Sequence, residues 1–314
     1  MKKLNIVVSL TTNDNDYQME QAAAAEEASR RLGINIQTIY AENDSILQSQ
    51  QLLKIIQSNS ESHPDGIIFE PVGGTALPQV ARAAAAAGIA WVVMNREVDY
   101  MADLRRAYRV PIFSVSGNHE EIGRIQGRQF ATLLPKGGTV LYIQGPSESL
   151  VAKNRTTGMY ETKPANIQIK AMKGNWTEGS AYKAVSSWLK LSTSLQSNID
   201  VIAAQNDAMA FGAKKAFQDM PDNNGRSRWL SLPYLGVDGV VKTGQAWVRS
   251  GLLAGTIISP PNTAQALEML VHALQTGIVP AERTYTTPRS FPEIDHLGAA
   301  HSEKTRVLAR GSSL

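Results

Sequence analysis

Polar residues follow short apolar runs at several points in this chain, and the clearest example lies within residues 202–212. There the apolar run 202–204 leads into Gln205, Asn206 and Asp207, and an Ala-rich stretch with helical spacing begins directly afterwards. We expect Asp207 to cap that helix, which leaves the side chain of Asn206 to project from the carboxyl end of the strand. In an open α/β sheet this edge is where ligands bind. The alternative is that these residues only turn the chain, a common role for Asn and Asp.

The other predicted strand ends carry a similar mixture of amide, charged and aromatic side chains. A polyhydroxylated ligand such as a sugar needs this mixture, because each hydroxyl both donates and accepts hydrogen bonds and the C–H faces pack on aromatic rings. The candidate ligand-binding residues are Ser9, Asn15, Tyr17, Glu70, Asn95, Arg96, Arg155, Trp176, Asn206, Asp238 and Ser259. Each type has an alternative role: Arg in a surface ion pair, Asp in a turn, and an aromatic ring on a packed helix face.

Strand and helix patterns alternate along the chain, which predicts parallel sheets with right-handed helical crossovers. The first series has strands at 5–11, 34–40, 66–69, 90–94 and 111–115, and helices at 17–32, 45–58, 75–87 and 118–134. The second has strands at 139–143, 167–172, 201–204, 230–237 and 253–258, and helices from 150 and at 177–195, 208–217, 240–250 and 263–275. A chain of 314 residues exceeds what one core usually supports, so we expect an α/β fold with two lobes.

Composition argues against several classes of protein. The formal charge of +3 is spread among residues of both signs, so nucleic acid is not indicated, and the absence of cysteine excludes disulfides and thiolate metal sites. No stretch approaches the roughly 18 apolar residues of a membrane span, so we expect a soluble protein. The five histidines lack metal-ligand spacing, and the chain has no P-loop, dinucleotide fingerprint or nucleophile elbow. We therefore expect no metal, no cofactor and no enzymatic activity.

Several local motifs resemble those of the ribose-binding-protein family, the type I periplasmic sugar-binding proteins of ABC importers. The run Ala-Gln-Asn-Asp-Ala-Met-Ala-Phe-Gly-Ala-Lys-Lys-Ala-Phe at 204–217 is the longest, and Gly-Val-Asp-Gly at 236–239 resembles that family's Gly-Phe-Asp-Gly. Asn95-Arg96 resembles its Asp-Arg, Arg155-Thr-Thr-Gly-Met its Arg-x-x-Gly-Phe, and the run 254–259 its strand into the second hinge. The resemblance extends from about residue 4 to residue 277.

The resemblance implies two similar α/β lobes of doubly wound parallel sheet, joined by three crossovers near Ser116, at 259–261 and between Tyr285 and Phe291. The expected N-terminal lobe comprises 1–115 and 261–285, and the C-terminal lobe 118–259 and 286–296. The remaining residues, 297–314, are polar, basic and aperiodic, and we expect a tail that lies over the surface or is disordered.

In function, the resemblance implies a monomeric substrate-binding protein that holds a sugar or polyol in a cleft between hinged lobes and delivers it to a membrane permease. Residues 1–4 carry no secretory signal, which fits either a cytoplasmic protein or one whose signal peptide has been removed. The resemblance favours the second, so we expect a periplasmic or extracytoplasmic protein. Two alternatives share this fold: the sensing domain of a LacI-type repressor, which would need a helix-turn-helix ahead of the first strand, and a binding protein that serves a chemoreceptor or sensor kinase.

Four positions depart from the ribose-binding pattern. Glu70 stands where ribose binders have Asn, Asn95 where they have Asp, Gln18 where a second Phe often stacks, and Ser259 where they have Gln. A carboxylate only accepts hydrogen bonds, whereas an amide both donates and accepts. We therefore expect a ligand other than ribose, one that offers its strongest donor near Glu70.

Overall fold

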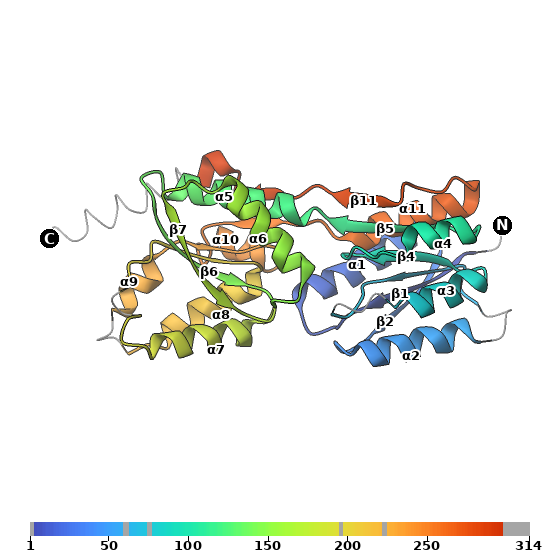
Figure 1. Ribbon diagram of the computed structural model, residues 1–314, viewed down its shortest axis with the longest axis horizontal. Coiled ribbons are helices and arrows are strands. Elements are labelled where there is room, and N and C mark those ends of the chain that lie inside the picture. The colour runs from blue at the N-terminus through green and yellow to red at the C-terminus, as the bar shows by residue number, and fades with distance from the viewer. Residues whose placement is uncertain (1–2, 59–62, 74–76, 195–196, 222–224, 298–314) are drawn as a thin grey trace. The chain divides into compact units, whose positions relative to one another are not determined.

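The computed structural model describes residues 3–58, 63–73, 77–194, 197–221 and 225–297 (Figure 1). The chain divides into two compact units. Unit 1 is Met1–Gly117 with Pro260–Thr286, and unit 2 is Asn118–Ser259 with the described residues from Thr287 onward. The chain thus passes from one unit to the other three times, after Gly117, Ser259 and Thr286. No helix among the described residues combines the length and apolarity that a membrane crossing requires.

Unit 1 is built on a six-stranded sheet in which every pair of neighbouring strands is parallel, in the order β11-β5-β4-β3-β1-β2. Its strands are β1 (Asn5–Leu10), β2 (Asn35–Tyr40), β3 (Gly66–Phe69), β4 (Ala90–Met94), β5 (Ile112–Gly117) and β11 (Arg283–Thr286). Its helices are α1 (Asp16–Leu32), α2 (Ser45–Ile56), α3 (Pro78–Ala86), α4 (Met101–Ala107) and α11 (Asn262–Thr276). The sequence patterns did not predict α4.

Helices cover both faces of this sheet (Figure 1). Successive side chains of a strand point to opposite faces, so Ile6 and Val8 pack with α1 and α11, whereas Val7 packs with α2, α3 and α4. Strands buried on both faces are apolar throughout, as β3 and β4 are. The first polar residue after each buried strand therefore stands at the carboxyl edge of the sheet.

Unit 2 has a four-stranded parallel sheet in the order β7-β6-β8-β9, with a separate antiparallel pair, β10 and β12. Parallel bridges from Leu235 to Gly255 and from Asp238 to Ile258 join this pair to the segment that begins with β9. The strands are β6 (Gly138–Gln144), β7 (Ile167–Lys173), β8 (Val201–Ala204), β9 (Tyr234–Leu235), β10 (Thr256–Ile258) and β12 (Arg289–Phe291). The helices are α5 (His119–Leu133), α6 (Leu150–Thr162), α7 (Glu178–Leu189), α8 (Asp207–Gln218), α9 (Arg226–Ser231) and α10 (Gly244–Arg249).

Helices α5 and α6 approach each other closely because each has a glycine at the crossing. A Cβ atom on Gly158 of α6 would lie 1.9 Å from the carbonyl oxygen of Glu120, and one on Gly123 of α5 would lie 2.1 Å from that of Arg155. A side chain at either position would collide with rigid backbone. This pair of glycines fixes the position of α6 and, with it, the backbone of Arg155.

The structure corrects several predicted elements of unit 2. The predicted strand at 230–237 is wrong: residues 230–231 end helix α9, which buries Trp229, and only Tyr234–Leu235 form a strand, β9. The predicted helix at 177–195 ends at Leu189, and β12 runs antiparallel to β10 in a fold predicted to be wholly parallel. Leu297, assigned to a surface tail, is 1% exposed and packs in the core with Phe130. The rest of that predicted tail, 298–314, lies outside the described residues.

Candidate ligand-binding site

Six of the predicted ligand-binding residues belong to unit 1 and five to unit 2. In unit 1, Ser9 lies in β1, Glu70 directly follows β3, and Asn95 and Arg96 directly follow β4. Asn15 and Tyr17 stand at the start of α1, after β1. Because β4, β3 and β1 are neighbours in the sheet, their carboxyl ends gather these residues at one edge.

The Glu70 carboxylate is buried and is held by an amide that directs it. Gln18 Oε1 accepts from the backbone N–H of Thr11 at 3.2 Å, so Gln18 Nε2 faces Glu70 and donates to Oε2 at 2.8 Å. Glu70 is 6% exposed, and no described basic side chain forms an ion pair with it. Gln48 fixes the main chain around Glu70, because its amide donates to the Glu70 carbonyl at 2.8 Å and accepts from the N–H of Val72 at 3.0 Å. Glu70 is thus an oriented acceptor that forms no ion pair with the basic side chains the structure describes.

Asn95 adopts a left-handed backbone conformation (φ 55°), which Asn tolerates better than most residues. Its Nδ2 donates to the Tyr17 hydroxyl at 3.3 Å, and its Oδ1 accepts from Nδ2 of Asn262 at the start of α11. Arg96 donates to the Asn95 carbonyl at 2.9 Å and to the Gly73 carbonyl at 3.4 Å. The amide, the phenol and the guanidinium therefore form one hydrogen-bonded group.

Two predicted contacts of unit 1 have structural roles in this conformation. Ser9 has no exposed surface, and its hydroxyl accepts from Gln48 Nε2 at 3.2 Å. Asn15 caps α1, because its Oδ1 accepts from the N–H of Gln18 at 2.9 Å. Both residues support the turns that carry Gln18 and Glu70.

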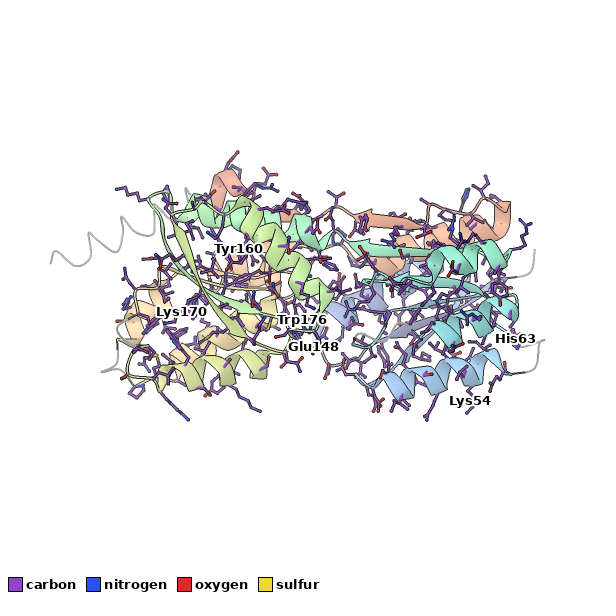
Figure 2. The ribbon with its side chains drawn as sticks, viewed as in Figure 1. Lys54, His63, Glu148, Tyr160, Lys170 and Trp176 are labelled. Carbon is purple, nitrogen blue, oxygen red and sulfur yellow. The ribbon has the colours of Figure 1, made fainter. Side chains whose placement is uncertain are left out.

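In unit 2, Arg155 is the centre of the candidate group. It is 5% exposed, donates to the Gln205 carbonyl, and lies 3.8 Å from the Asp238 carboxylate. Its guanidinium carbon is 5.7 Å from the centroid of the Trp176 ring, within the range of a cation–π contact. Trp176, labelled in Figure 2, precedes α7. Its φ is 62°, and that of Asp238 is 106°. Positive φ values at residues other than glycine store strain and commonly mark ligand sites.

The N-cap of α8 is Asn206 and not Asp207, which the sequence predicted. Asn206 caps α8, with Oδ1 accepting from the N–H of Met209 at 2.9 Å and Nδ2 donating to the Trp176 carbonyl at 2.8 Å. Asp207 turns inward instead, where it accepts from the N–H of Gly239 at 2.8 Å and from the Thr256 hydroxyl at 2.7 Å. The prediction of the cap was wrong because partners distant in sequence claim the Asp207 carboxylate.

Two glycines pack tightly against the Asp207 carboxylate. A Cβ atom at Gly236 or Gly244 would lie 2.0 Å from one of its oxygens. Burial raises the pKa of Asp207 well above its ordinary value, and the nearby Asp238 carboxylate raises it further. Asp207 is therefore a structural carboxylate that fixes the loop on which Asp238 stands.

Ser259 donates its backbone N–H to the Asp238 carbonyl at 3.0 Å. Its hydroxyl is buried, and the described residues offer that hydroxyl no hydrogen-bond partner; the same holds for Nε of Arg155. Buried polar groups are normally paired, so these two atoms are candidates for hydrogen bonds to a ligand.

Four buried amides orient these residues: Gln18, Gln48, Gln205 and Asn262. The Gln205 side chain accepts from the N–H of Gly145 at 2.8 Å and donates to the Ala152 carbonyl at 2.9 Å, so the carbonyl that receives Arg155 is fixed. The sequence signal for Gln205 was its place beside Asn206, and for Asn262 its place directly after the predicted crossover at 259–261. Neither pattern reveals which hydrogen bonds the amide makes.

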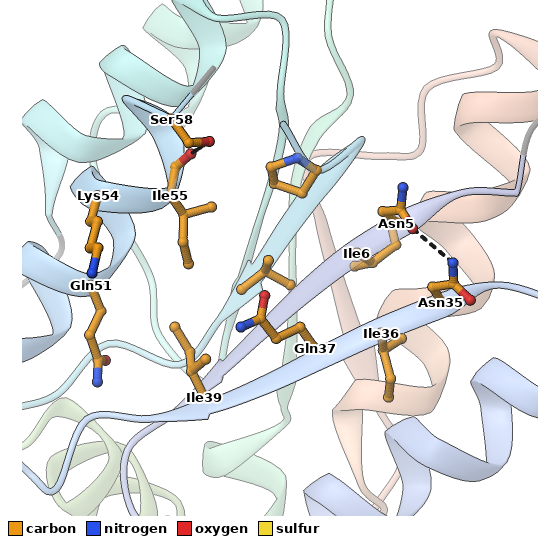
Figure 3. A pocket seen from close by; sticks show the side chains of 12 residues that line it. Asn5, Ile6, Asn35, Ile36, Gln37, Ile39, Gln51, Lys54, Ile55 and Ser58 are labelled. Carbon is orange, nitrogen blue, oxygen red and sulfur yellow. Dashed lines mark hydrogen bonds between the residues drawn. The ribbon is translucent and has the colours of Figure 1, made fainter. Parts of the chain in front are cut away.

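Unit 1 also has an open groove of about 580 Å³ between α2 and the edge strand β2 (Figure 3). Ile36, Ile39 and Ile55 contribute apolar surface, and Gln51 and Lys54 contribute polar groups. It contains none of the predicted ligand-binding residues. The described residues also include no group of three or more His, Asp or Glu side chains that could hold a metal ion.

Comparison with known proteins establishes the class of this chain. A family model described as a periplasmic binding protein domain matches residues 6–277, so the chain belongs to that family. The resemblance drawn from the sequence and the two-lobed α/β fold class are confirmed. The family consists of ligand-binding proteins of transport systems.

Among individual relatives, the chain is similar to the D-apiose import binding protein of Paraburkholderia graminis, with 24% identity over 281 residues that cover 87% of this chain and 82% of the relative. It is also 26% identical over 218 residues to the D-ribose/D-allose-binding protein of Pseudomonas aeruginosa, covering 68% and 65%. Its fold matches a solute binding protein of Actinobacillus succinogenes with bound D-allose, at a TM-score of 0.78, 22% identity and coverage of 92% and 97%.

Proposed function

We propose that the chain is the substrate-binding protein of an ABC sugar importer and that it binds a sugar or polyol with the polar groups at the carboxyl edges of both sheets. The observation that carries this proposal is the set of oriented side chains in unit 2. Arg155 and Ser259 hold buried polar atoms without a partner among the described residues, and Asp238 stands beside them at a strained backbone position. A polyhydroxylated ligand supplies both donors and acceptors to such groups.

Unit 1 complements this set chemically. Glu70 offers a carboxylate acceptor that is not ion-paired within the described part of the chain, Arg96 offers donors, and the Tyr17 ring is half-buried at the same edge. Hydrogen bonds to charged groups contribute about 1.5 to 3 kcal/mol each, whereas an unpaired buried polar group costs a similar amount. Such a set selects among sugars by the positions of their hydroxyls. Relatives whose names specify D-apiose, xylitol, or D-ribose and D-allose support this ligand class.

The remaining parts of the proposal follow from the same family. The protein acts outside the cytoplasm, as a monomer, and presents its loaded form to a membrane permease. No step of this function makes or breaks a covalent bond, so the protein is not an enzyme. Because a ligand that contacts both units favours their closed arrangement, the radius of gyration is expected to fall when a tight ligand is added.

A thermal-shift screen tests the proposal with pentoses, hexoses, deoxy-sugars, amino-sugars and inositols, and with amino acids as a negative set. A ligand at a hundredfold excess over its Kd adds about 2.7 kcal/mol to the free energy of unfolding. We expect a sugar or polyol to raise the Tm of the wild type and of Lys54→Ala, whose exposed side chain lines the groove away from the site. The same compound should raise the Tm of Asp238→Asn much less. If amino acids alone raise the Tm, or if the two variants respond equally, the proposed function is wrong.

A further inference from the structure

Asn262, the first residue of α11, has no exposed surface and hydrogen-bonds to Asn95 of the candidate site. Its Nδ2 donates to Oδ1 of Asn95. Its own Oδ1 is buried, and no described group donates a hydrogen bond to it. Among the described residues, the Asn262 side chain therefore forms its hydrogen bond with Oδ1 of Asn95.

This contact decides which end of the Asn95 amide points outward. The main chain of Asn95 is held at both sides, because its N–H donates to the Val115 carbonyl at 3.1 Å and its carbonyl accepts from Arg96 at 2.9 Å. With Oδ1 engaged by Asn262, only Nδ2 remains on the side of the Tyr17 hydroxyl. An amide nitrogen carries two hydrogens, so one remains for a ligand.

Turning the Asn95 amide alone is unfavourable, because it would place two amide nitrogens, both donors, against each other. The Asn262 side chain is buried, and its Nδ2 donates to Oδ1 of Asn95. With Asn262 in this orientation, Asn95 keeps its Oδ1 toward Asn262 and its Nδ2 toward the Tyr17 hydroxyl.

We propose that Asn262 is a positioning residue that makes Asn95 a hydrogen-bond donor toward the ligand. Unit 1 then presents an acceptor at Glu70 and a donor at Asn95. The ligand offers hydroxyl hydrogens to Glu70 and an oxygen lone pair to Asn95. The statement about the ligand rests on the proposed function, whereas the orientation of Asn95 does not.

A titration without ligand tests whether Asn262 donates a hydrogen bond to position 95. In Asn95→Asp, the new carboxylate would receive a hydrogen bond from Nδ2 of Asn262, and hydrogen bonds to the ionised form lower a carboxyl pKa. Asp tolerates the left-handed backbone conformation at this position. The pKa of the carboxyl group at position 95 is measured by 13C NMR. We expect it to be higher by about one pH unit in the double variant Asn95→Asp, Asn262→Leu, which lacks the donor, than in the single variant Asn95→Asp. Glu70 and Arg96 are unchanged in both proteins, so their influence cancels in the comparison.

Thr263 provides the matched control, because it is buried in the same helical turn and its hydroxyl bonds to Gln21. The double variant Asn95→Asp, Thr263→Val should keep the pKa of the single variant. If removing Asn262 leaves the pKa unchanged or lowers it, Asn262 does not donate to position 95 and the proposal fails. Folding of each variant is checked by the dispersion of its amide NMR spectrum.

Calorimetry with D-ribose, D-allose and myo-inositol, each paired with a singly deoxygenated analogue, tests the consequence for the ligand. In Asn262→Leu the Asn95 amide is free to turn. For each pair we compare the Kd of the deoxygenated compound with the Kd of its hydroxylated partner. This ratio should be at least fivefold smaller in Asn262→Leu than in Thr263→Val. A preference that both variants retain overturns the specificity role. If no compound binds the wild type, the sugar and polyol ligand class of the proposed function fails for these compounds, while the carboxyl titration still decides whether Asn262 donates to position 95.

Discussion

The contact between α5 and α6 predicts a large effect for the substitution Gly158→Ala. The new methyl group would lie 1.9 Å from the carbonyl oxygen of Glu120 and 3.0 Å from the backbone nitrogen of Arg124. Both atoms belong to the backbone of α5, so no side-chain rotation relieves the collision. The helices must separate by about 1 Å or more to restore ordinary contact distances of about 3.5 Å.

The magnitude follows from two opposing effects. Overpacking of a well-filled contact costs about 1 to 3 kcal/mol, and a backbone collision belongs at the upper end of that range. Replacing Gly by Ala inside a helix contributes about 0.5 to 1 kcal/mol of stability in return. We therefore expect a net loss of about 2 kcal/mol in the free energy of unfolding of unit 2. Because Arg155 lies one turn before Gly158, its distance to Asp238 should also change, which would weaken ligand binding about tenfold.

Urea denaturation followed by tryptophan fluorescence measures the loss of unfolding free energy in unit 2. This unit contains four tryptophans, Trp176, Trp188, Trp229 and Trp247. Gly179→Ala in α7 is the matched control, because a Cβ atom there meets no atom within 4 Å. We expect this control to be at least as stable as the wild type. A Gly158→Ala protein as stable as Gly179→Ala would refute the argument that the glycine fixes the approach of the two helices.

Three further outcomes are expected. Asn206→Ala should lower the free energy of unfolding by about 1 kcal/mol, because α8 loses its cap; an unchanged urea midpoint would contradict that role. Gln18→Leu should weaken ligand binding about tenfold in calorimetry, since Glu70 loses the donor that orients it, and unaltered affinity would leave Gln18 without that function. Asp207 binds its proton more tightly in the folded state than in the unfolded state, because its pKa is raised in the folded protein. The protonated side chain therefore contributes most to stability at low pH. This contribution is lost as the pH rises from the ordinary pKa of Asp toward the raised pKa of Asp207. Asp207→Asn should therefore show a shallower fall in unfolding free energy over that pH range, and an identical slope would exclude the raised pKa.

The sequence by itself determined the features that depend on local periodicity. Apolar runs such as those of β3 and β4, followed by helices with amphipathic spacing, predicted parallel sheets correctly, because a strand buried on both faces must be apolar throughout. The same logic identified Glu70 and Asn95 as the first polar residues beyond buried strands. The existence of three crossovers came from the family resemblance, since no local pattern marks them.

Only the tertiary structure decided what each polar side chain binds. Asp207 turned inward because Gly239 and Thr256, 32 and 49 residues away, supply its hydrogen bonds, and Asn206 became the cap in its place. Asn95 acquires its orientation from Asn262, which is 167 residues distant. A donor and an acceptor at such separations meet only when the chain is folded. Residue type and local spacing indicate that a side chain can form hydrogen bonds, whereas the packed fold selects the partner.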